Sequence, residues 1–297
     1  MNEKFSGLWP AMFTPVAIDG APAYDQLEKL TDLLVAQGLD GLYLLGSTGQ
    51  GVLFTEEQRM KVTEVVMGVV AGRVPVMVQV GSLTTAEAIR LAQSAEKAGA
   101  DAISSVGPIY FSGSAQMALE HYDSIAKATD LPFFPYQLGN NSIPGDTISF
   151  IDHLMAMPNV QGMKLTTGNL LEISLIHNHA KNRLRLFSGA DELLCQASLC
   201  GTSGAIGTFY NLWGVECKRV IERFRRGNFE DSRTFMLTFQ DIINRVLPNI
   251  WTFLRKAMML KYSIDIGATK APLGGGQEAW SDETVLSIMQ ELESAAE

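Results

Sequence analysis

Eight short apolar segments recur along the chain, and amphipathic segments separate them. The expected strands cover residues 7–15, 41–45, 74–80, 100–106, 131–136, 160–165, 184–187 and 204–208. Helical patterns follow them, for example at 24–37, 55–71, 85–98, 115–128 and 146–157. Strands that alternate with helices favour a parallel sheet, and continuous apolar strands are typical of sheets buried on both faces. This alternation limits the chain to an α/β fold.

Two α/β architectures suit eight such units: a closed (β/α)8 TIM barrel and an open doubly wound sheet. A barrel needs about 250 residues, whereas an open sheet more often has a Gly-rich dinucleotide loop after its first strand. The first strand here ends in Phe13-Thr14-Pro15 without such a loop. The pattern then turns purely helical at 231–245, 250–262 and 282–296. We predict a (β/α)8 barrel over 1–227 and a C-terminal helical extension over 228–297, packed together as one structural unit.

Composition excludes several classes of function. The chain has 297 residues, 46% of them hydrophobic and 19% charged, with a net charge of −9. A negative net charge argues against nucleic acid as a partner, and the apolar stretches are too short to span a bilayer. The first residues lack a signal-peptide pattern. The three cysteines have no metal-type spacing and are interpreted as reduced thiols. We expect a cytoplasmic globular protein.

Lys164 lies in the sixth apolar run, Gly162-Met163-Lys164-Leu165-Thr166. Lys is almost never fully buried unless a partner holds it. Burial favours a neutral amine, which can attack a carbonyl carbon and form a Schiff base. The alternative is a lysine whose stem packs against apolar neighbours while its ammonium group reaches water. The run by itself leaves both interpretations open.

Other polar residues follow the expected strands, where a barrel of this type places its catalytic groups. Gly46-Ser47-Thr48-Gly49 can hold an anion with N–H groups and hydroxyls, or can be an ordinary loop that caps a helix. Tyr110 and Tyr136 can transfer protons, or can pack in the core.

The last two strands also end in polar residues. Asp191 and Glu192 can bind sugar hydroxyls, or can favour the first turn of the next helix through its dipole. Thr208 places a hydroxyl at the end of the eighth strand.

Metal sites and catalytic triads have little support. The chain has no His-Glu-x-x-His, no clustered Cys and His, and no Gly-x-Ser-x-Gly. His177 and His179 are two residues apart and do not share a helix face. His121 and His153 are expected on helix surfaces. We predict neither a metal nor a cofactor.

Taken in order, the motifs resemble the dihydrodipicolinate synthase/N-acetylneuraminate lyase family of class I pyruvate-dependent aldolases. The resemblance covers most of the chain and includes Thr14-Pro15, Gly46-Ser47-Thr48-Gly49, Tyr110, Tyr136, Gly162-Met163-Lys164-Leu165-Thr166, Lys256-Ala257 and Pro272-Leu273-Gly274. The Gly-Ser-Thr-Gly loop combined with a later Gly-x-Lys strand is specific. The resemblance implies a (β/α)8 barrel with a C-terminal helical extension, usually a homotetramer, without metal or organic cofactor.

The resemblance also implies a role for each matching residue. Lys164 would form the Schiff base with the keto carbon of pyruvate or another 2-keto acid, and Tyr136 beside it would transfer protons. Ser47 and Thr48 would hold the carboxylate. Tyr110 matches a relay tyrosine that some members receive from a neighbouring subunit.

Several positions look like the lyase branch of the family. Thr166-Thr167-Gly168 fits that branch, and so does the acidic pair in Gly189-Ala190-Asp191-Glu192, which in that branch binds the polyhydroxyl tail of sialic acid. Thr208 stands where the branch uses a small hydroxyl. We therefore include Thr166, Gly189 and Thr208 among the expected substrate-binding residues.

Other positions depart from the family's patterns. The synthases place an Arg soon after the fifth-strand Tyr, but residues 137–144 contain none and include a small insertion. The usual Tyr-Asn-Ile-Pro is missing, and Gln50 replaces a common Glu. The missing Arg argues against aspartate semialdehyde as the partner. The other two changes border the substrate pocket and leave open which 2-keto-3-deoxy sugar acid is used.

We therefore expect a carbon–carbon lyase that cleaves or forms an N-acetylneuraminate-like 2-keto-3-deoxy sugar acid, with pyruvate and an aldose as the other compounds. The alternatives are a synthase that condenses pyruvate with an aldehyde, a keto-deoxy sugar acid dehydratase, and a non-catalytic sugar-acid binding protein. The expected partners are the small-molecule substrate and identical subunits of a homotetramer, with no nucleic acid and no membrane.

Overall fold

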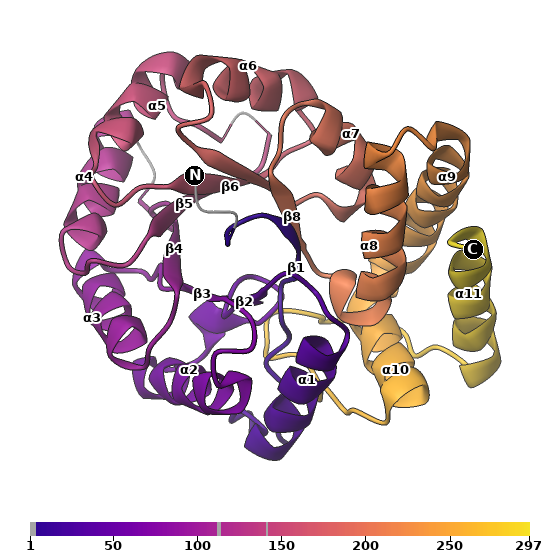
Figure 1. Ribbon diagram of the computed structural model, residues 1–297. Coiled ribbons are helices and arrows are strands. Elements are labelled where there is room, and N and C mark those ends of the chain that lie inside the picture. The colour runs from indigo at the N-terminus through magenta and orange to yellow at the C-terminus, as the bar shows by residue number, and fades with distance from the viewer. Residues whose placement is uncertain (1–3, 112–113, 141) are drawn as a thin grey trace.

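The computed structural model describes residues 4–111, 114–140 and 142–297, and within these ranges eight parallel strands form a barrel ringed by helices (Figure 1). The strands are β1 (Gly7–Pro10), β2 (Leu42–Leu44), β3 (Val76–Gln79), β4 (Ala102–Val106), β5 (Phe133–Leu138), β6 (Gly162–Thr166), β7 (Arg185–Ser188) and β8 (Gly204–Gly207). Their order is β1-β8-β7-β6-β5-β4-β3-β2. A parallel bridge between Ala11 and Tyr43 joins the two ends of the sheet. The predicted TIM barrel is confirmed.

Helices alternate with the strands and then continue into the predicted extension. The ring contains α1 (Tyr24–Ala36), α2 (Glu56–Val70), α3 (Thr85–Lys97), α4 (Ala115–Ala126), α5 (Thr147–Ala156), α6 (Leu170–Ala180), α7 (Leu194–Leu199) and α8 (Tyr210–Arg225). The extension contains α9 (Phe229–Val246), α10 (Ile250–Tyr262) and α11 (Asp282–Ala295). In Figure 1 it lies outside the ring beside α8, and α11 packs on α9 and α10. The expected boundary at 227–228 falls in the turn between α8 and α9, and the division itself stays a prediction.

Most strand boundaries differ from the predicted ones by one or two residues, and the carboxyl ends of β1 and β5 matter most for the site. β1 ends at Pro10 instead of Pro15. The N–H groups of Ala11 and Met12 still donate to the carbonyls of Gly207 and Tyr43, each at 2.8 Å, but the N–H of Phe13 donates to the side chain of Asn211 at 3.4 Å and no longer to a neighbouring strand. β5 continues past Tyr136 because Leu138 pairs with Thr166 of β6. The candidate residue Tyr136 therefore lies inside a strand and not at its end.

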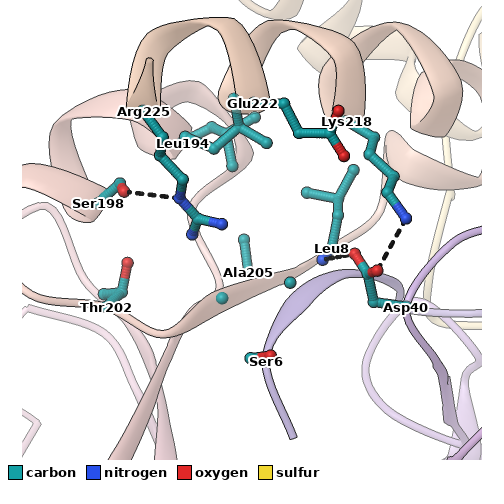
Figure 2. A pocket seen from close by; sticks show the side chains of 13 residues that line it. Ser6, Leu8, Asp40, Leu194, Ser198, Thr202, Ala205, Lys218, Glu222 and Arg225 are labelled. Carbon is teal, nitrogen blue, oxygen red and sulfur yellow. Dashed lines mark hydrogen bonds and ion pairs between the residues drawn. The ribbon is translucent and has the colours of Figure 1, made fainter. Parts of the chain in front are cut away.

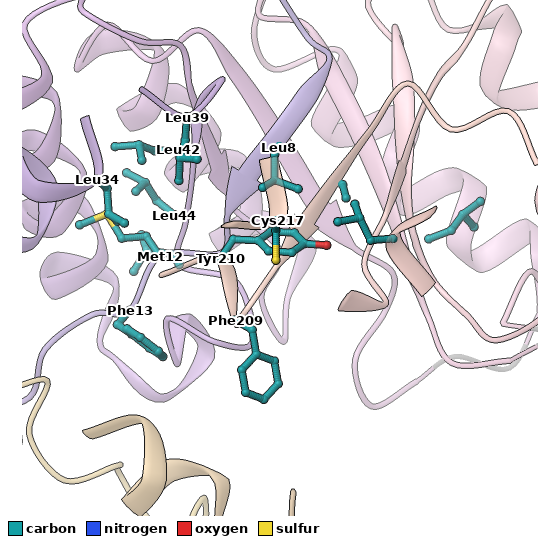
Figure 3. Close-up of a cluster of buried hydrophobic side chains, with 14 of the residues drawn as sticks. Leu8, Met12, Phe13, Leu34, Leu39, Leu42, Leu44, Phe209, Tyr210 and Cys217 are labelled. Atoms are coloured by element: carbon teal, nitrogen blue, oxygen red, sulfur yellow. The ribbon is translucent and has the colours of Figure 1, made fainter. Parts of the chain in front are cut away.

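Two sets of buried side chains make up the core. One fills the barrel itself and consists of Phe5, Trp9, Ala11, Tyr43, Met77, Ala102, Phe134, Phe187 and Ile206. The larger set packs the outer face of the strands against the helices and the extension. Figure 3 shows part of it, where Leu8, Leu42 and Leu44 from strands meet Leu34 of α1 and Cys217 of α8.

The pleat of the strands determines which residues lie above this interior layer. Side chains alternate along a strand, so the residue two positions after an inward residue also points inward. Three interior residues, Phe134, Phe187 and Ile206, each have an expected site residue two positions later in the chain. These site residues are Tyr136, Gly189 and Thr208. On β6 the same step leads from Gly162 to Lys164. Four of the expected site residues, Tyr136, Lys164, Gly189 and Thr208, therefore face one space at the carboxyl ends of the strands.

Candidate active site

Lys164 is inside the barrel and only 5% exposed. Its Nζ lies 4.3 Å from the ring centroid of Tyr136 and 4.5 Å from that of Tyr43. Two positions earlier on β6, Gly162 leaves room for the Phe134 ring, since a Cβ there would lie 2.6 Å from Phe134 Cε1 and would overlap the Arg185 carbonyl. Among the described residues no carboxylate oxygen lies within 4.0 Å of Lys164 Nζ. The amine is thus held by aromatic faces, which attract a cation but form no ion pair with it.

Tyr136 and Thr166 form a pair of hydroxyls next to Lys164. Their side-chain oxygens are 3.1 Å apart, and Tyr136 pairs with Lys164 across the β5–β6 ladder. Gly189 on the neighbouring strand faces them closely. A Cβ at Gly189 would overlap Thr166 Oγ1 and would lie 2.9 Å from Lys164 Cε. The lack of a side chain at Gly189 therefore makes room for the Thr166 hydroxyl beside the stem of Lys164.

Tyr43 belongs to this cluster, although the sequence analysis did not identify it. It is fully buried on β2, and its hydroxyl donates to Ser104 Oγ at 3.1 Å. Burial, followed by the nearby Tyr136 phenol, raises the pKa of Tyr43 well above its ordinary value, so its phenol is neutral. In the sequence it looks like one apolar residue of the run Leu42-Tyr43-Leu44. The alternation of side chains along the strand, which puts Tyr43 on the face opposite to Leu42 and Leu44, is the sequence signal that could have identified it.

A second pair of hydroxyls spans the mouth of the barrel from β2 to β8. Thr48 Oγ1 lies 2.6 Å from Thr208 Oγ1, and Thr48 is 6% exposed. Ser47, the preceding residue in the loop, is exposed. The structure thus brings Thr48 and Thr208 together and leaves the Ser47 hydroxyl open to solvent.

Asp191 and Glu192 have different surroundings. Asp191 is 5% exposed, and its Oδ2 accepts the N–H of Phe209 at 2.7 Å. Burial raises the pKa of Asp191 to about 7, although the Phe209 N–H and the charge of Lys164 oppose the rise. Glu192 is exposed, and its backbone carbonyl accepts a hydrogen bond from Gln240 of α9 at 2.7 Å. The Asp191 carboxylate is thus buried and bonded to the backbone, whereas Glu192 lies at the surface.

Cavities border the Lys164 cluster on two sides. One, of about 460 Å³, is lined by Gly189, Asp191, Glu192 and Thr208 and is closed on its far side by residues of α9. The other, of about 380 Å³, is lined by Tyr136 and the loops after β4 and β5. Both volumes are in the range of small-molecule sites. The acidic pair thus faces a compartment that the C-terminal extension helps to build.

A further cavity, of about 210 Å³, lies at the opposite end of the barrel (Figure 2). It is lined by the first residues of β1 and β8 together with side chains of α7 and α8. Its Lys218 and Asp40 are 2.8 Å apart, and Asp40 also accepts the Leu8 N–H at 2.7 Å. These charges hold the barrel's amino end together, and none of the expected site residues lies there.

Tyr110 does not join the cluster within this chain. Its side chain is 78% exposed, and its ring contacts Phe111 edge to face with centroids 5.0 Å apart. Its catalytic role stays a prediction, and within this chain its ring faces solvent.

The histidines correct one expectation. His121 is buried and not on the surface, because its ring joins three elements: Nδ1 lies 2.9 Å from Thr85 Oγ1, and Nε2 lies 3.4 Å from Ser105 Oγ. Burial lowers the pKa of His121, which favours the neutral ring. In the described part of the chain, no three His, Cys, Asp or Glu residues gather as metal ligands would. Over the same residues, no helix has the length and apolar character needed to cross a membrane.

The fold and the cluster around Lys164 define a TIM-barrel protein with a polar site at the carboxyl ends of its strands. The model of the Dihydrodipicolinate synthetase family matches residues 4–291. The chain belongs to this family.

Individual relatives share the whole length of the chain. The N-acetylneuraminate lyase of Escherichia fergusonii is 27% identical over 292 residues, which is 98% of each chain. The N-acetylneuraminate lyase structure from Mycoplasma synoviae has a TM-score of 0.87 and 28% identity, covering 99% of this chain and 98% of that one. A catalytic lysine mutant of sialic acid aldolase from Ruminococcus gnavus has a TM-score of 0.91 and 25% identity, with the same coverage. These names indicate a lyase or aldolase.

Proposed function

We propose that this protein is a Schiff-base aldolase that splits an N-acetylneuraminate-like 2-keto-3-deoxy sugar acid into pyruvate and an aldose, and that Lys164 is its nucleophile. One observation carries the proposal: Lys164 is buried in the barrel between two tyrosine rings, without a carboxylate partner. A lysine kept out of water and free of an ion pair is suited to attack a carbonyl. A catalytic lysine is also named for the Ruminococcus gnavus aldolase.

The chemistry follows from the positions of the side chains. The unprotonated form of the Lys164 amine adds to the keto carbon, and the carbinolamine takes up one proton and loses water to give an iminium ion; hydrolysis of the iminium returns that proton at the end of the cycle. The iminium accepts the electron pair of the C3–C4 bond as that bond breaks, while the proton of the C4 hydroxyl passes to a base and the aldose leaves. The resulting enamine takes a proton at C3, and water then releases pyruvate and the free amine.

Tyr136 is the proposed proton carrier for these steps. Its ring covers Lys164 Nζ at 4.3 Å, and its hydroxyl is 3.1 Å from Thr166 Oγ1. A phenol at this distance from the amine can move a proton to and from the substrate hydroxyl. The loop with Ser47 and Thr48 is proposed to hold the carboxylate of the keto acid through its hydroxyls and N–H groups.

The cavity beside Gly189 is proposed to hold the sugar part of the substrate. It contains the buried Asp191, the exposed Glu192 and the hydroxyl of Thr208. Carboxylates accept hydrogen bonds from hydroxyls, so a polyhydroxylated chain fits this lining better than a second carboxylate would. This chemistry favours a sugar acid over an acidic aldehyde.

Reductive trapping tests the proposal directly. The protein is incubated with pyruvate and borohydride, digested, and analysed by mass spectrometry. We expect a three-carbon adduct on Lys164 and none in Lys164→Met, which keeps the bulk of the stem. Wild-type protein that stays unmodified at Lys164 would refute the Schiff base.

A substrate panel then separates the alternatives. Pyruvate release from 2-keto-3-deoxy sugar acids is measured alongside dehydration of the same compounds and condensation of pyruvate with aldehydes. We expect release to dominate. A dehydrated product without pyruvate would identify a dehydratase, and binding without turnover would identify a sugar-acid binding protein.

The site is also proposed to be completed by a second copy of the chain, as in a homotetramer. Ile109, Tyr110 and Phe111 are 40%, 78% and 71% exposed on one loop, and adjacent exposed apolar residues are typical of interaction surfaces. We expect a tetramer by light scattering, and Tyr110→Phe is expected to lower turnover without changing the mass of the particle. A fully active monomer would contradict both points.

A further inference from the structure

The loop that connects β2 to α2 has a backbone that its sequence does not favour. Leu45 and Gln50 bracket Gly46-Ser47-Thr48-Gly49, and their φ values are 59° and 55°. Residues with a side chain rarely adopt this left-handed region, and the conformation costs free energy unless surrounding contacts impose it. The loop therefore needs external contacts to keep its shape.

One such contact comes from within the loop and another from far along the chain. The N–H of Gln50 donates to the Ser47 carbonyl at 3.1 Å, which closes the turn. The Gln50 side chain is buried, and its Oε1 accepts the backbone N–H of Lys270 at 2.7 Å. A buried neutral hydrogen bond of this kind fixes both the side chain and the backbone from which it extends.

Lys270 belongs to the segment between α10 and α11, here called the C-terminal strap (residues 264–273). The strap is anchored beside the site at two further points. The N–H of Val16 donates to the Ile266 carbonyl at 3.0 Å, and Lys270 Nζ donates to the Gly20 carbonyl at 2.6 Å. At Gly267, with φ of 73°, a Cβ would overlap the Val16 carbonyl, so the strap lies directly against the chain that follows β1.

We infer that Gln50 is a positioning residue, through which the C-terminal strap holds the Ser47-Thr48 loop in the shape that binds the substrate carboxylate. The inference rests on the proposed function, since it concerns the carboxylate part of the same site. It gives the extension a part in catalysis beyond its packing against the barrel. A Glu at this position would also offer an oxygen to the Lys270 N–H, whereas an apolar side chain would not.

The test uses a matched pair of variants. Gln50→Leu keeps the size of the side chain and loses the acceptor, whereas Gln50→Glu keeps the acceptor. The amount of borohydride-trapped Lys164 adduct is measured against pyruvate concentration. Loss of one buried hydrogen bond predicts a half-saturating concentration about tenfold higher in Gln50→Leu, with the maximal adduct unchanged. Gln50→Glu is expected to stay within about twofold of the wild type.

The outcomes separate this inference from the proposed function. No adduct in wild-type protein refutes the Schiff base itself. Normal half-saturation in Gln50→Leu, or an equal loss in Gln50→Glu, refutes the role of Gln50 and leaves the Schiff base in place.

A measurement on wild-type protein covers the case in which Gln50→Leu does not fold. The coupling free energy between two binding events is reciprocal. If the hydrogen bond between Gln50 and Lys270 strengthens pyruvate binding, bound pyruvate must therefore strengthen that hydrogen bond. We expect hydrogen exchange of the Lys270 amide to slow when pyruvate is bound. Unchanged exchange of that amide would overturn the inference.

Discussion

Replacing Gly189 by Ala adds one methyl group at the most crowded point of the site. That methyl group would overlap Thr166 Oγ1 and lie 2.9 Å from Lys164 Cε. Gly189 is not among the residues with positive φ, so the backbone accepts alanine and the cost is purely one of packing. Overpacking of this kind costs about 1–3 kcal/mol of unfolding free energy.

The effect on turnover is expected to be larger than the effect on stability. The Thr166 hydroxyl now lies 3.1 Å from the Tyr136 hydroxyl. Relief of the overlap must either move it away from Tyr136 or shift the stem of Lys164. A displacement of about 1 Å in reacting groups costs about 100-fold in rate. We therefore expect kcat for pyruvate release to fall about 100-fold, while the protein still unfolds cooperatively in urea.

Two further variants identify the cause. In Gly189→Ala/Thr166→Ala the overlapping oxygen is gone but the contact with Lys164 Cε remains, so we expect unfolding stability to recover in part while turnover stays low. At Gly68 in α2 an added Cβ would meet no atom within 4 Å, and Gly68→Ala is expected to stabilise the helix by about 1 kcal/mol without changing kcat. Wild-type stability and wild-type kcat in Gly189→Ala would refute the crowding described here.

Three other substitutions test separate parts of the site. Tyr136→Phe keeps the ring over Lys164 but removes its hydroxyl, so pyruvate should still be trapped while turnover falls about 100-fold or more; an unchanged kcat would exclude Tyr136 as proton carrier. In wild-type protein the pKa of Asp191 is about 7 when folded and near 3.8 when unfolded, so the folded state binds the proton more tightly. The unfolding free energy is therefore expected to fall by up to about 4 kcal/mol as pH rises from about 4 to 7. Asp191→Asn should flatten that slope in urea titrations, and a parallel slope would contradict the assignment. Thr48→Val removes the hydroxyl that lies 2.6 Å from Thr208 Oγ1 and should raise KM about tenfold with little change in thermal stability. An unchanged KM would argue against a role of Thr48 in substrate binding.

The sequence predicted the units of the fold well because each one has a strong local signal. The helical pattern expected from residue 55 matches α2, which begins where Thr55 and Gln58 exchange hydrogen bonds in a capping box. Short apolar runs between helical patterns located the eight strands that the described residues contain. The ends of β1 and β5 were less predictable because pairing with neighbours, such as Leu138 with Thr166, determines where a strand stops.

The site was only partly predictable for a related reason. Lys164 stood out because a lysine is unusual in an apolar strand, and Asp191 and Thr208 follow strand ends. Tyr43 was missed because a tyrosine among leucines looks like core, and only the closed barrel brings its ring to 4.5 Å from Lys164 Nζ.

Contacts between distant parts of the chain leave no local trace. Gln50 and Lys270 are 220 residues apart, and nothing in either sequence neighbourhood indicates their hydrogen bond. The burial of His121 escaped prediction likewise, since its partners Thr85 and Ser105 lie on other elements.

The rings beneath Lys164 have a kinetic consequence. Phe134 packs against Phe5 and Phe187 with centroids 5.1 and 5.9 Å apart, and all three are at most 2% exposed. Nothing the size of a substrate passes such a layer, so the amine can be approached only from the carboxyl ends of the strands. Under the proposed function, the keto acid occupies the deepest position and the aldose lies above it. In the direction of synthesis pyruvate must therefore enter first, and in the direction of cleavage it must leave last.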